Sequence, residues 1–180
     1  MKKEWNVVDI LRYARHDWLN KLQLIKGNIA LNRLDRANEI IEEIIIEAKH
    51  ESSLTNTKMN LFAGYIMTYH WNSLPLRLEV EVLGEARDLS HYDKELYEWL
   101  SSFVHVLEET SDYTEENHLS ISLFFDQSSV RFFFDFSGIL TDSSDVEKWL
   151  MKYGYNQRLQ VISQEVTTNE ASVVIELNEE

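Results

Sequence analysis

The feature that most constrains the fold of this chain is a long amphipathic segment at its start. With residues placed at 100° steps, one narrow apolar stripe runs along it with spacings of three and four residues. The stripe consists of Val7, Leu11, Ala14, Trp18, Leu22, Ile25 and Ile29. This pattern predicts a helix from about Trp5 to Leu31, and its spacing is typical of a helical bundle or coiled-coil seam. A helix of about 27 residues would be roughly 40 Å long, which is long for a small globular domain.

A second amphipathic segment follows a short polar break at residues 32–35. Asp35 is the expected N-cap, and a helix is predicted from about Arg36 to His50 or a little further. Its apolar stripe consists of Ala37, Ile41, Ile44 and Ala48, widened by Ile40 and Ile45. The short connection predicts an antiparallel hairpin, which we assign to residues 1–55. Two helices cannot cover their own apolar stripes, so a second copy is expected to complete a four-helix bundle.

The pattern changes after the polar stretch at residues 51–58, and residues 56–180 are predicted to form a small α/β sandwich domain. Helices are expected at residues 60–71, ending at Ser73-Leu74-Pro75, at 92–109, and at 146–153, ending near Gly154. Strands are expected at 76–82, 119–125, 130–136, 159–166 and 172–177, with a hairpin at 126–129. The whole chain is therefore predicted to be α+β, with the strands in one layer and the helices in another.

Composition excludes several classes of function. The chain has 180 residues and no cysteine, so a disulfide framework, a zinc–cysteine site and a thiol nucleophile are all excluded. Its net charge of −14 argues against binding nucleic acid. The start of the chain is not a signal peptide, and no apolar run approaches the roughly 20 residues that span a bilayer. A cytoplasmic protein without membrane contact is expected.

The charge is distributed unevenly along the chain. Residues 1–36 hold eight basic and four acidic side chains, a charge of +4, which leaves −18 for the rest. A basic first segment on an acidic protein suggests a docking surface for an acidic protein partner. An ordinary solvated helix face would explain the same distribution.

The residues that could carry chemistry lie on the first predicted helix. His16 points about 180° away from the apolar stripe, and Asn20, Gln23 and Gly27 lie within roughly 40° of it. A neutral imidazole on the wet face of a rigid helix offers a lone pair for nucleophilic attack. By its facing alone, His16 could equally be an ordinary surface histidine. The other histidines form no metal-binding spacing, and His70 and His105 are expected to pack near helix core faces.

The first helix carries the string Arg15-His16-Asp17-Trp18-Leu19-Asn20-Lys21-Leu22-Gln23, continued to Gly27. This string resembles the phosphoacceptor helix of the sporulation initiation phosphotransferase B family. The pattern His-Asp-x-x-Asn-x-Leu-Gln also occurs in citrate-type sensor histidine kinases. The likeness to the phosphotransferases continues through residues 42–43, 48–52, 81–85 and 88–90. It is weaker from Glu116 to the C-terminus, so it covers nearly the whole chain.

The resemblance implies a homodimer whose four-helix bundle displays His16 of each copy as a phosphoacceptor. It implies a phosphotransferase that takes phosphoryl from the aspartyl phosphate of one response regulator and passes it to a second, the transcription factor that starts sporulation. The partners would therefore be two receiver domains. No cofactor of the chain's own is expected, and the Mg²⁺ needed for transfer would come with the receiver's acidic pocket.

Five neighbours of His16 are candidates for supporting roles. Asp17 could orient the imidazole, and Asn20 and Gln23 could contact the incoming domain. Arg15 and Lys21 flank the site and could steer that domain toward it. Plain solvation of these side chains is an open alternative.

The resemblance also implies that the C-terminal domain looks like the ATP-binding domain of histidine kinases but has lost the nucleotide site. The helix expected at 92–109 reads Leu100–Glu109 without an asparagine, and Asp135-Phe136-Ser137-Gly138 keeps one aspartate and one glycine of a glycine box. Two other functions remain open: an ATP-dependent histidine kinase fragment, and a non-catalytic dimeric adaptor that docks response regulators.

Overall fold

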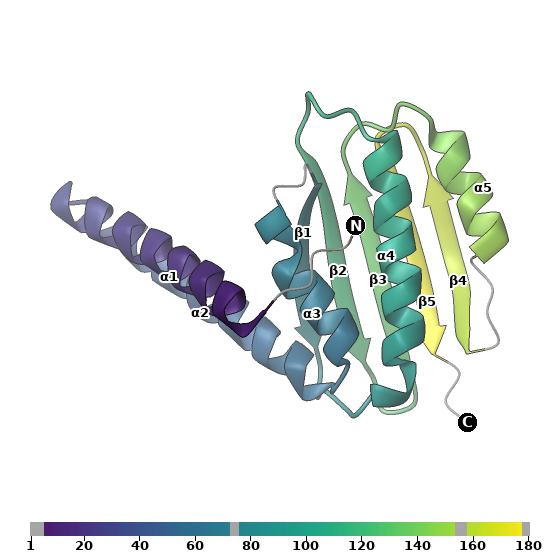
Figure 1. Cartoon of the computed structure of the whole chain (residues 1–180), viewed down its shortest axis with the longest axis horizontal. Coiled ribbons are helices and arrows are strands. Elements are labelled where there is room, and N and C mark those ends of the chain that lie inside the picture. The colour runs from purple at the N-terminus through teal and green to yellow at the C-terminus, as the bar shows by residue number, and fades with distance from the viewer. Residues whose placement is uncertain (1–5, 73–75, 154–157, 178–180) are drawn as a thin grey trace. The chain divides into compact units, whose positions relative to one another are not determined.

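The computed structural model describes residues 6–72, 76–153 and 158–177 (Figure 1). The chain divides into two compact units, Met1–Lys49 and His50–Glu180. Helices come first and a five-stranded sheet with its own helices follows, so the predicted α+β class is confirmed. Among the helices in the described ranges, none combines the length and the apolar character that crossing a membrane requires.

The first unit contains the helix α1 (Val7–Ala30) and most of the helix α2 (Leu34–Asn56), whose last turns belong to the second unit. Asn6 caps α1, because its side-chain oxygen accepts a hydrogen bond from the backbone N–H of Asp9 at 2.9 Å. The chain turns between the helices at Asn32, whose φ of 55° lies in the left-handed region that asparagine tolerates. The prediction of a long first helix is confirmed, although Trp5 lies outside the described residues.

The second helix differs from its prediction at both ends. It begins at Leu34, so Asp35 lies inside the first turn and the predicted N-cap is wrong. The Asp35 carboxylate still stabilises the helix, because it lies near the positive end of the helix dipole. At the other end the helix continues to Asn56, through the polar stretch that was expected to end it. The cause is tertiary: Leu54 is completely buried in the core of the second unit, and this burial stabilises the last turn.

Residues 50–58, at the start of the second unit, make three contacts with later residues of the same unit. The His50 Nδ1 accepts a hydrogen bond from the backbone N–H of Val82 at 3.1 Å, and Leu89 N–H donates to Thr57 O at 2.8 Å. The Lys58 ammonium pairs with Asp88 at 2.5 Å. Lys58, followed by the Ser90 hydroxyl and N–H, holds the pKa of Asp88 below its usual value. These contacts hold residues 50–58 against the rest of the second unit.

The second unit has one mixed sheet in the order β1-β2-β3-β5-β4. Its strands are β1 (Leu76–Leu83), β2 (Asn117–Phe125), β3 (Val130–Ser137), β4 (Leu159–Val166) and β5 (Glu170–Leu177). β1 runs parallel to β2 and the other pairs are antiparallel, which includes the predicted β2–β3 hairpin. The helices α3 (Asn60–Tyr69), α4 (Asp93–Thr110) and α5 (Ser143–Tyr153) lie on one face of the sheet (Figure 1). Two short 3₁₀ helices, His70–Asn72 and Ser90–Tyr92, complete the described elements.

The core of this unit lies between the sheet and the three helices. Alternate residues of β3 point inward, so Phe132 and Phe134 are buried while Phe133 is half-buried, as a buried sheet strand predicts. Trp99 of α4 lies 4.8 Å from Phe134 and 5.3 Å from Trp149 of α5, measured between ring centroids. These aromatic contacts join the two helices to the sheet.

The predicted packing roles of two histidines are wrong. His70 is exposed, and the His105 side chain is 68% exposed. His105 lies about 100° around α4 from Val104, which is enough to turn it from the core face toward Glu109 in solvent. The predicted helix ends at Ser73-Leu74-Pro75 and Gly154 lie outside the described residues.

Candidate functional site

The candidate site is the exposed face of α1 around His16. The His16 side chain is 69% exposed, and both of its polar contacts within the described residues go to one ring nitrogen. The Nδ1 lies 3.2 Å from Asn20 Nδ2 and 3.4 Å from Asp17 Oδ1. The other nitrogen, Nε2, has no hydrogen-bond partner among the residues that the structure describes. The helical repeat explains this geometry, because residue i+4 lies beside residue i on one face.

The two neighbours require different protonation states of Nδ1. A carboxylate oxygen of Asp17 can only accept a hydrogen bond, so this contact requires a proton on Nδ1. The amide nitrogen of Asn20 can only donate, so this contact requires a lone pair on Nδ1. One ring cannot satisfy both at the same time. The protonation state of Nδ1 therefore decides which neighbour holds the imidazole.

Lys21 lies on a different side of α1 from His16. Its ammonium pairs with Glu47 of α2 at 2.5 Å, and it lies 5.9 Å from the centroid of the Trp18 ring. The pair joins the two helices one turn beyond the histidine. Sequence reasoning did not find Glu47, because the register of one helix against another is not written in either helix alone.

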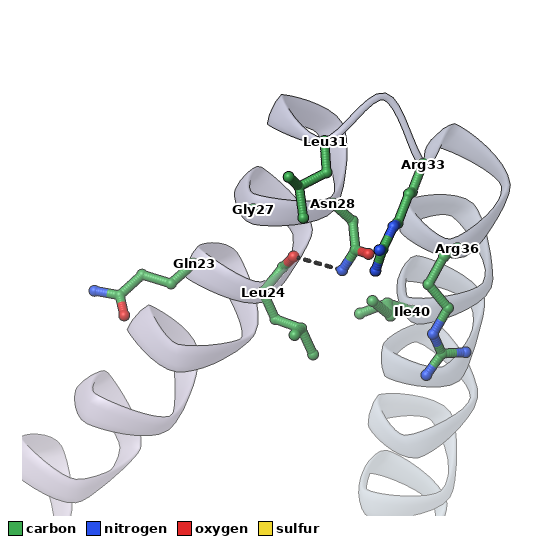
Figure 2. Close-up of a pocket in the computed structure, with 8 residues that line it drawn as sticks. All are labelled: Gln23, Leu24, Gly27, Asn28, Leu31, Arg33, Arg36 and Ile40. Atoms are coloured by element: carbon green, nitrogen blue, oxygen red, sulfur yellow. Dashed lines mark hydrogen bonds between the residues drawn. The ribbon is translucent and has the colours of Figure 1, made fainter.

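The structure leaves Arg15 and Gln23 exposed on α1. Gln23 lies on the same face as His16, two turns along the helix, and Figure 2 shows it pointing away from the space between α1 and α2. The structure thus gathers Asp17 and Asn20 at the imidazole, and it brings neither Arg15, Lys21 nor Gln23 into contact with the ring.

An open groove of about 570 Å³ lies between α1 and α2 near the turn that joins them (Figure 2). It is lined by Gln23, Leu24, Gly27, Asn28, Leu31, Arg33, Arg36 and Ile40. Gly27 borders free space, since a Cβ built there would meet no atom within 4 Å. Gly27, which the helical repeat places on the same face as His16, is therefore not required by packing within this chain.

The apolar stripe of α1 is largely uncovered. Ala14 and Ile25 are half-buried, and on α2 Ala37 and Ile40 are buried. The remaining large members of the stripe are between 52% and 71% exposed: Val7, Leu11, Trp18, Leu22 and Ile29. On α2, Leu34, Ile41 and Ile45 are exposed as well. The hairpin thus presents apolar side chains of both helices to solvent.

In the second unit, Gly138 of the string Asp135-Phe136-Ser137-Gly138 lies close to neighbouring protein atoms. A Cβ on Gly138 would lie 2.2 Å from Asn117 Oδ1 and 2.8 Å from Phe136. The Asn117 amide is buried, donates to the carbonyls of Asp112 and Glu115, and accepts from Ile139 N–H. Gly138 is therefore needed for the close approach of Asn117.

The α4 and α5 helices also close against each other. The Trp149 indole N–H of α5 donates to Ser102 Oγ of α4 at 3.0 Å, and the rings of Trp149 and Phe103 lie 5.4 Å apart. Leu140, just after β3, is buried beneath them. The inner face of α4 is thus occupied by aromatic and aliphatic side chains.

Comparison with known proteins gives matches over the whole chain. A family model described as the C-terminal domain of sporulation initiation phosphotransferase B matches residues 58–178. A second model, the alpha-helical domain of the SpoOB-type sensor kinases, matches residues 1–57. Sporulation initiation phosphotransferase B of Bacillus subtilis (strain 168) is 38% identical over 174 residues, which cover 96% of this chain and 90% of that protein.

Solved structures give weaker matches. The Acinetobacter baumannii histidine kinase AdeS matches with a TM-score of 0.44 and 9% identity, covering 91% of this chain and 97% of that one. A bacterial phosphotransferase matches with a TM-score of 0.41 and 12% identity, covering 96% and 98%. The histidine kinase ThkA, solved in complex with the response regulator protein TrrA, matches with a TM-score of 0.43 and 14% identity, covering 94% and 60%.

Proposed function

Since the chain belongs to the sporulation initiation phosphotransferase B family, we propose that it is a phosphorelay enzyme that carries the phosphoryl group on His16. It accepts the group from the aspartyl phosphate of one response regulator and passes it to the aspartate of a second at the start of sporulation. The observation that carries the proposal is the exposed imidazole, whose Nδ1 has two polar neighbours and whose Nε2 has no hydrogen-bond partner within the described residues. The protein acts in the cytoplasm.

The chemistry needs little beyond alignment and charge neutralisation. An aspartyl phosphate is an acyl phosphate, and the Nε2 lone pair attacks its phosphorus in line as the carboxylate leaves. The product is a phosphoramidate, which is reactive enough to pass the group to another aspartate. Mg²⁺ bound in the receiver's acidic pocket neutralises the phosphoryl oxygens. Asp17 favours the attack, because a hydrogen bond from Nδ1–H to its carboxylate stabilises the tautomer with the lone pair on Nε2.

The supporting residues act through the partner or the helix. Gln23, on the same face as His16, contacts the docked receiver domain, and Arg15 attracts that acidic domain. Lys21 contributes by joining α1 to α2 through Glu47 at the level of the site.

The active form is a homodimer. The apolar stripes of α1 and α2 form a surface whose exposure to water is unfavourable. A second copy of the hairpin would cover this surface in a four-helix bundle. An isologous pair places one His16 on each side of the bundle. The proposed dimer therefore has two equivalent phosphoacceptor sites.

The transfer does not use ATP. Phosphate binding needs backbone that a ligand can approach closely, and Asn117 already occupies that position at Gly138. Titration calorimetry with Mg-ATP should show no binding below millimolar concentration. A low-micromolar dissociation constant, or label on His16 from ATP alone, would move the protein to the class of histidine kinases.

The decisive experiment is transfer from a receiver domain. The full chain is incubated with a receiver domain carrying a labelled aspartyl phosphate and Mg²⁺, and the label should appear on the chain and then on a second receiver. The His16→Gln variant should remain folded and dimeric but take up no label. Receiver binding without any label on the wild-type chain would instead indicate a non-catalytic adaptor.

A further inference from the structure

The imidazole of His16 has two competing neighbours at one nitrogen. Asn20 Nδ2 lies 3.2 Å and Asp17 Oδ1 lies 3.4 Å from Nδ1. The first is a donor and the second an acceptor, so each stabilises a different protonation state of the ring. Both residues lie on α1, the helix that carries the histidine.

We infer that Asn20 is a positioning residue that keeps the phosphorylated imidazole unprotonated at Nδ1 and therefore slow to discharge, while Asp17 holds the protonated, reactive ring. This inference rests on the proposed function, because it assumes that the group is carried on Nε2. Asp17 is then the partner of Nδ1 in both transfer steps, and Asn20 is its partner in the stored state between them.

In the loading step Asp17 is the partner of the ring. Nδ1 carries a proton and donates a hydrogen bond to Asp17 Oδ1, so the lone pair is on Nε2. Nε2 forms a bond to phosphorus, the bond from phosphorus to the acyl oxygen breaks, and the receiver's carboxylate leaves with the electron pair. The ring then carries phosphoryl on Nε2 and a proton on Nδ1.

In the stored state Asn20 becomes the partner. The Nδ1 proton passes through Asp17 or directly to water, which leaves a neutral phosphorylated ring with a lone pair on Nδ1. The Asn20 amide donates to this lone pair across the 3.2 Å contact. Neutral phosphoimidazole is a poor leaving group, because breaking its bond to phosphorus would leave an imidazolate anion.

In the discharge step the hydrogen-bond partner of Nδ1 changes back from Asn20 to Asp17. A proton returns to Nδ1, Asn20 loses its acceptor, and Asp17 accepts from the new N–H. The aspartate of the second receiver attacks phosphorus, and the bond to Nε2 breaks with its electron pair on the ring. The products are a new aspartyl phosphate and a neutral imidazole with its proton on Nδ1, ready for the next loading step.

Other charged groups near this part of α1 have partners elsewhere or lie off the ring. Arg12 pairs with Asp9 at 3.3 Å, and Lys21 pairs with Glu47 of α2. Arg15 is exposed on the adjacent position of the helix. The polar contacts of Nδ1 within the described residues are those with Asp17 and Asn20.

The test measures the loss of phosphoryl to water as a function of pH. The full chain is phosphorylated with phosphoramidate, a small-molecule donor that needs no receiver, and the phosphohistidine signal is followed by ³¹P NMR. The His16→Gln variant supplies the background from the other histidines. Asn20→Ala should discharge about three- to tenfold faster near neutral pH, the effect of losing one exposed hydrogen bond.

The pH profile separates this role from a structural one. For Asn20→Ala, the midpoint of the profile should rise by about half a unit to one unit, while the acid plateau is unchanged. Asn20→Asp places an acceptor where the donor was and should raise the midpoint further. Asn28→Asp makes the same change on α1, three turns from the histidine, and should behave like the wild type.

Two results would overturn the inference. An unchanged midpoint in both Asn20 variants would mean that the amide does not donate to Nδ1. A rate changed by the same factor at every pH would mean that Asn20 acts through the fold of the helix. The proposed function fails separately, if the wild-type chain takes no phosphoryl from a receiver even though phosphoramidate loads His16 and the midpoint shifts.

Discussion

The two units of this chain differ in how far their apolar side chains are buried within the chain. In the second unit the sheet and three helices bury their large side chains, and Leu96, Leu100, Phe103 and Leu107 of α4 are almost completely shielded. In the first unit α1 has no buried residue at all within Val7–Ala30. One unit therefore completes its core within the chain, whereas we expect the other to be completed by a second copy.

This difference also separates the roles of the two units. The exposed hairpin presents His16, the proposed phosphoacceptor, on its polar face and its apolar side chains on another. In the enclosed unit Gly138 instead packs closely against Asn117. Four substitutions test the comparison, from the largest expected effect to the smallest.

Leu22→Asp should have the largest effect, because it places a charge in the surface that the second copy is expected to cover. Burying an unpaired carboxylate there costs several kcal/mol, so the dimer should dissociate. Analytical ultracentrifugation should show about one chain mass of 21.3 kDa in place of two. Glu42→Asp, a change of length alone on the exposed face of α2, is the matched control. If the wild-type chain itself sediments as a monomer at micromolar concentration, the comparison between the units is wrong.

Leu100→Ala should destabilise the second unit by about 2–5 kcal/mol, because Leu100 is completely buried and its loss leaves a cavity. Thermal unfolding followed at several protein concentrations checks this. The drop in Tm of the second unit should not depend on concentration, whereas unfolding of the hairpin should. A concentration-dependent effect of Leu100→Ala would show that the second unit also needs a partner for its core.

Tyr69→Phe tests the buried polar contact between α3 and α4. The Tyr69 hydroxyl donates to Glu108 Oε1 at 2.6 Å, and burial, followed by this hydrogen bond, raises the pKa of Tyr69. Removing the hydroxyl should cost about 1–3 kcal/mol at neutral pH, since Glu108 loses a hydrogen bond to its charge.

The raised pKa of Tyr69 also predicts how the free energy of unfolding changes at alkaline pH. The folded state keeps the Tyr69 proton after an unfolded tyrosine would ionise, so this stabilisation is complete below pH about 10 and falls as the pH rises further. Tyr69→Phe should make that fall less steep in urea titrations at different pH. Tyr113→Phe is a control, because its hydroxyl donates to a backbone carbonyl and its ring is exposed. Equal slopes in wild type and Tyr69→Phe would contradict the raised pKa.

Glu47→Gln should have the smallest effect. The Lys21–Glu47 pair is partly exposed, so removing its charge should lower the free energy of unfolding by at most about 1 kcal/mol. Urea titration at low and high salt measures it, and the loss should shrink at high salt because the pair is screened. Reversing the pair with Lys21→Glu and Glu47→Lys should restore most of the stability. No recovery in the double variant would mean that Lys21 acts through another contact.

Local pattern was enough to determine much of this protein. The periodicity of α1, the outward facing of His16 and the alternation of β3 are properties of neighbouring residues, because a helix or strand repeats its geometry every few positions. The position of Asn20 beside His16 follows from the same repeat. For this reason the α+β class, most of the elements and the family motif could be read without coordinates.

Contacts between distant residues were decided by the tertiary structure alone. The α2 helix passes through a polar stretch because Leu54 is buried in a core that the sheet provides, and helical propensity contains no term for that burial. The pairing of Lys21 with Glu47 depends on the register between two helices, and the contact of Asn117 with Gly138 joins the start of β2 to the end of β3. The orientation of the His16 ring, with Nδ1 toward Asn20 and Asp17, depends on side-chain rotamers that the helical repeat leaves free.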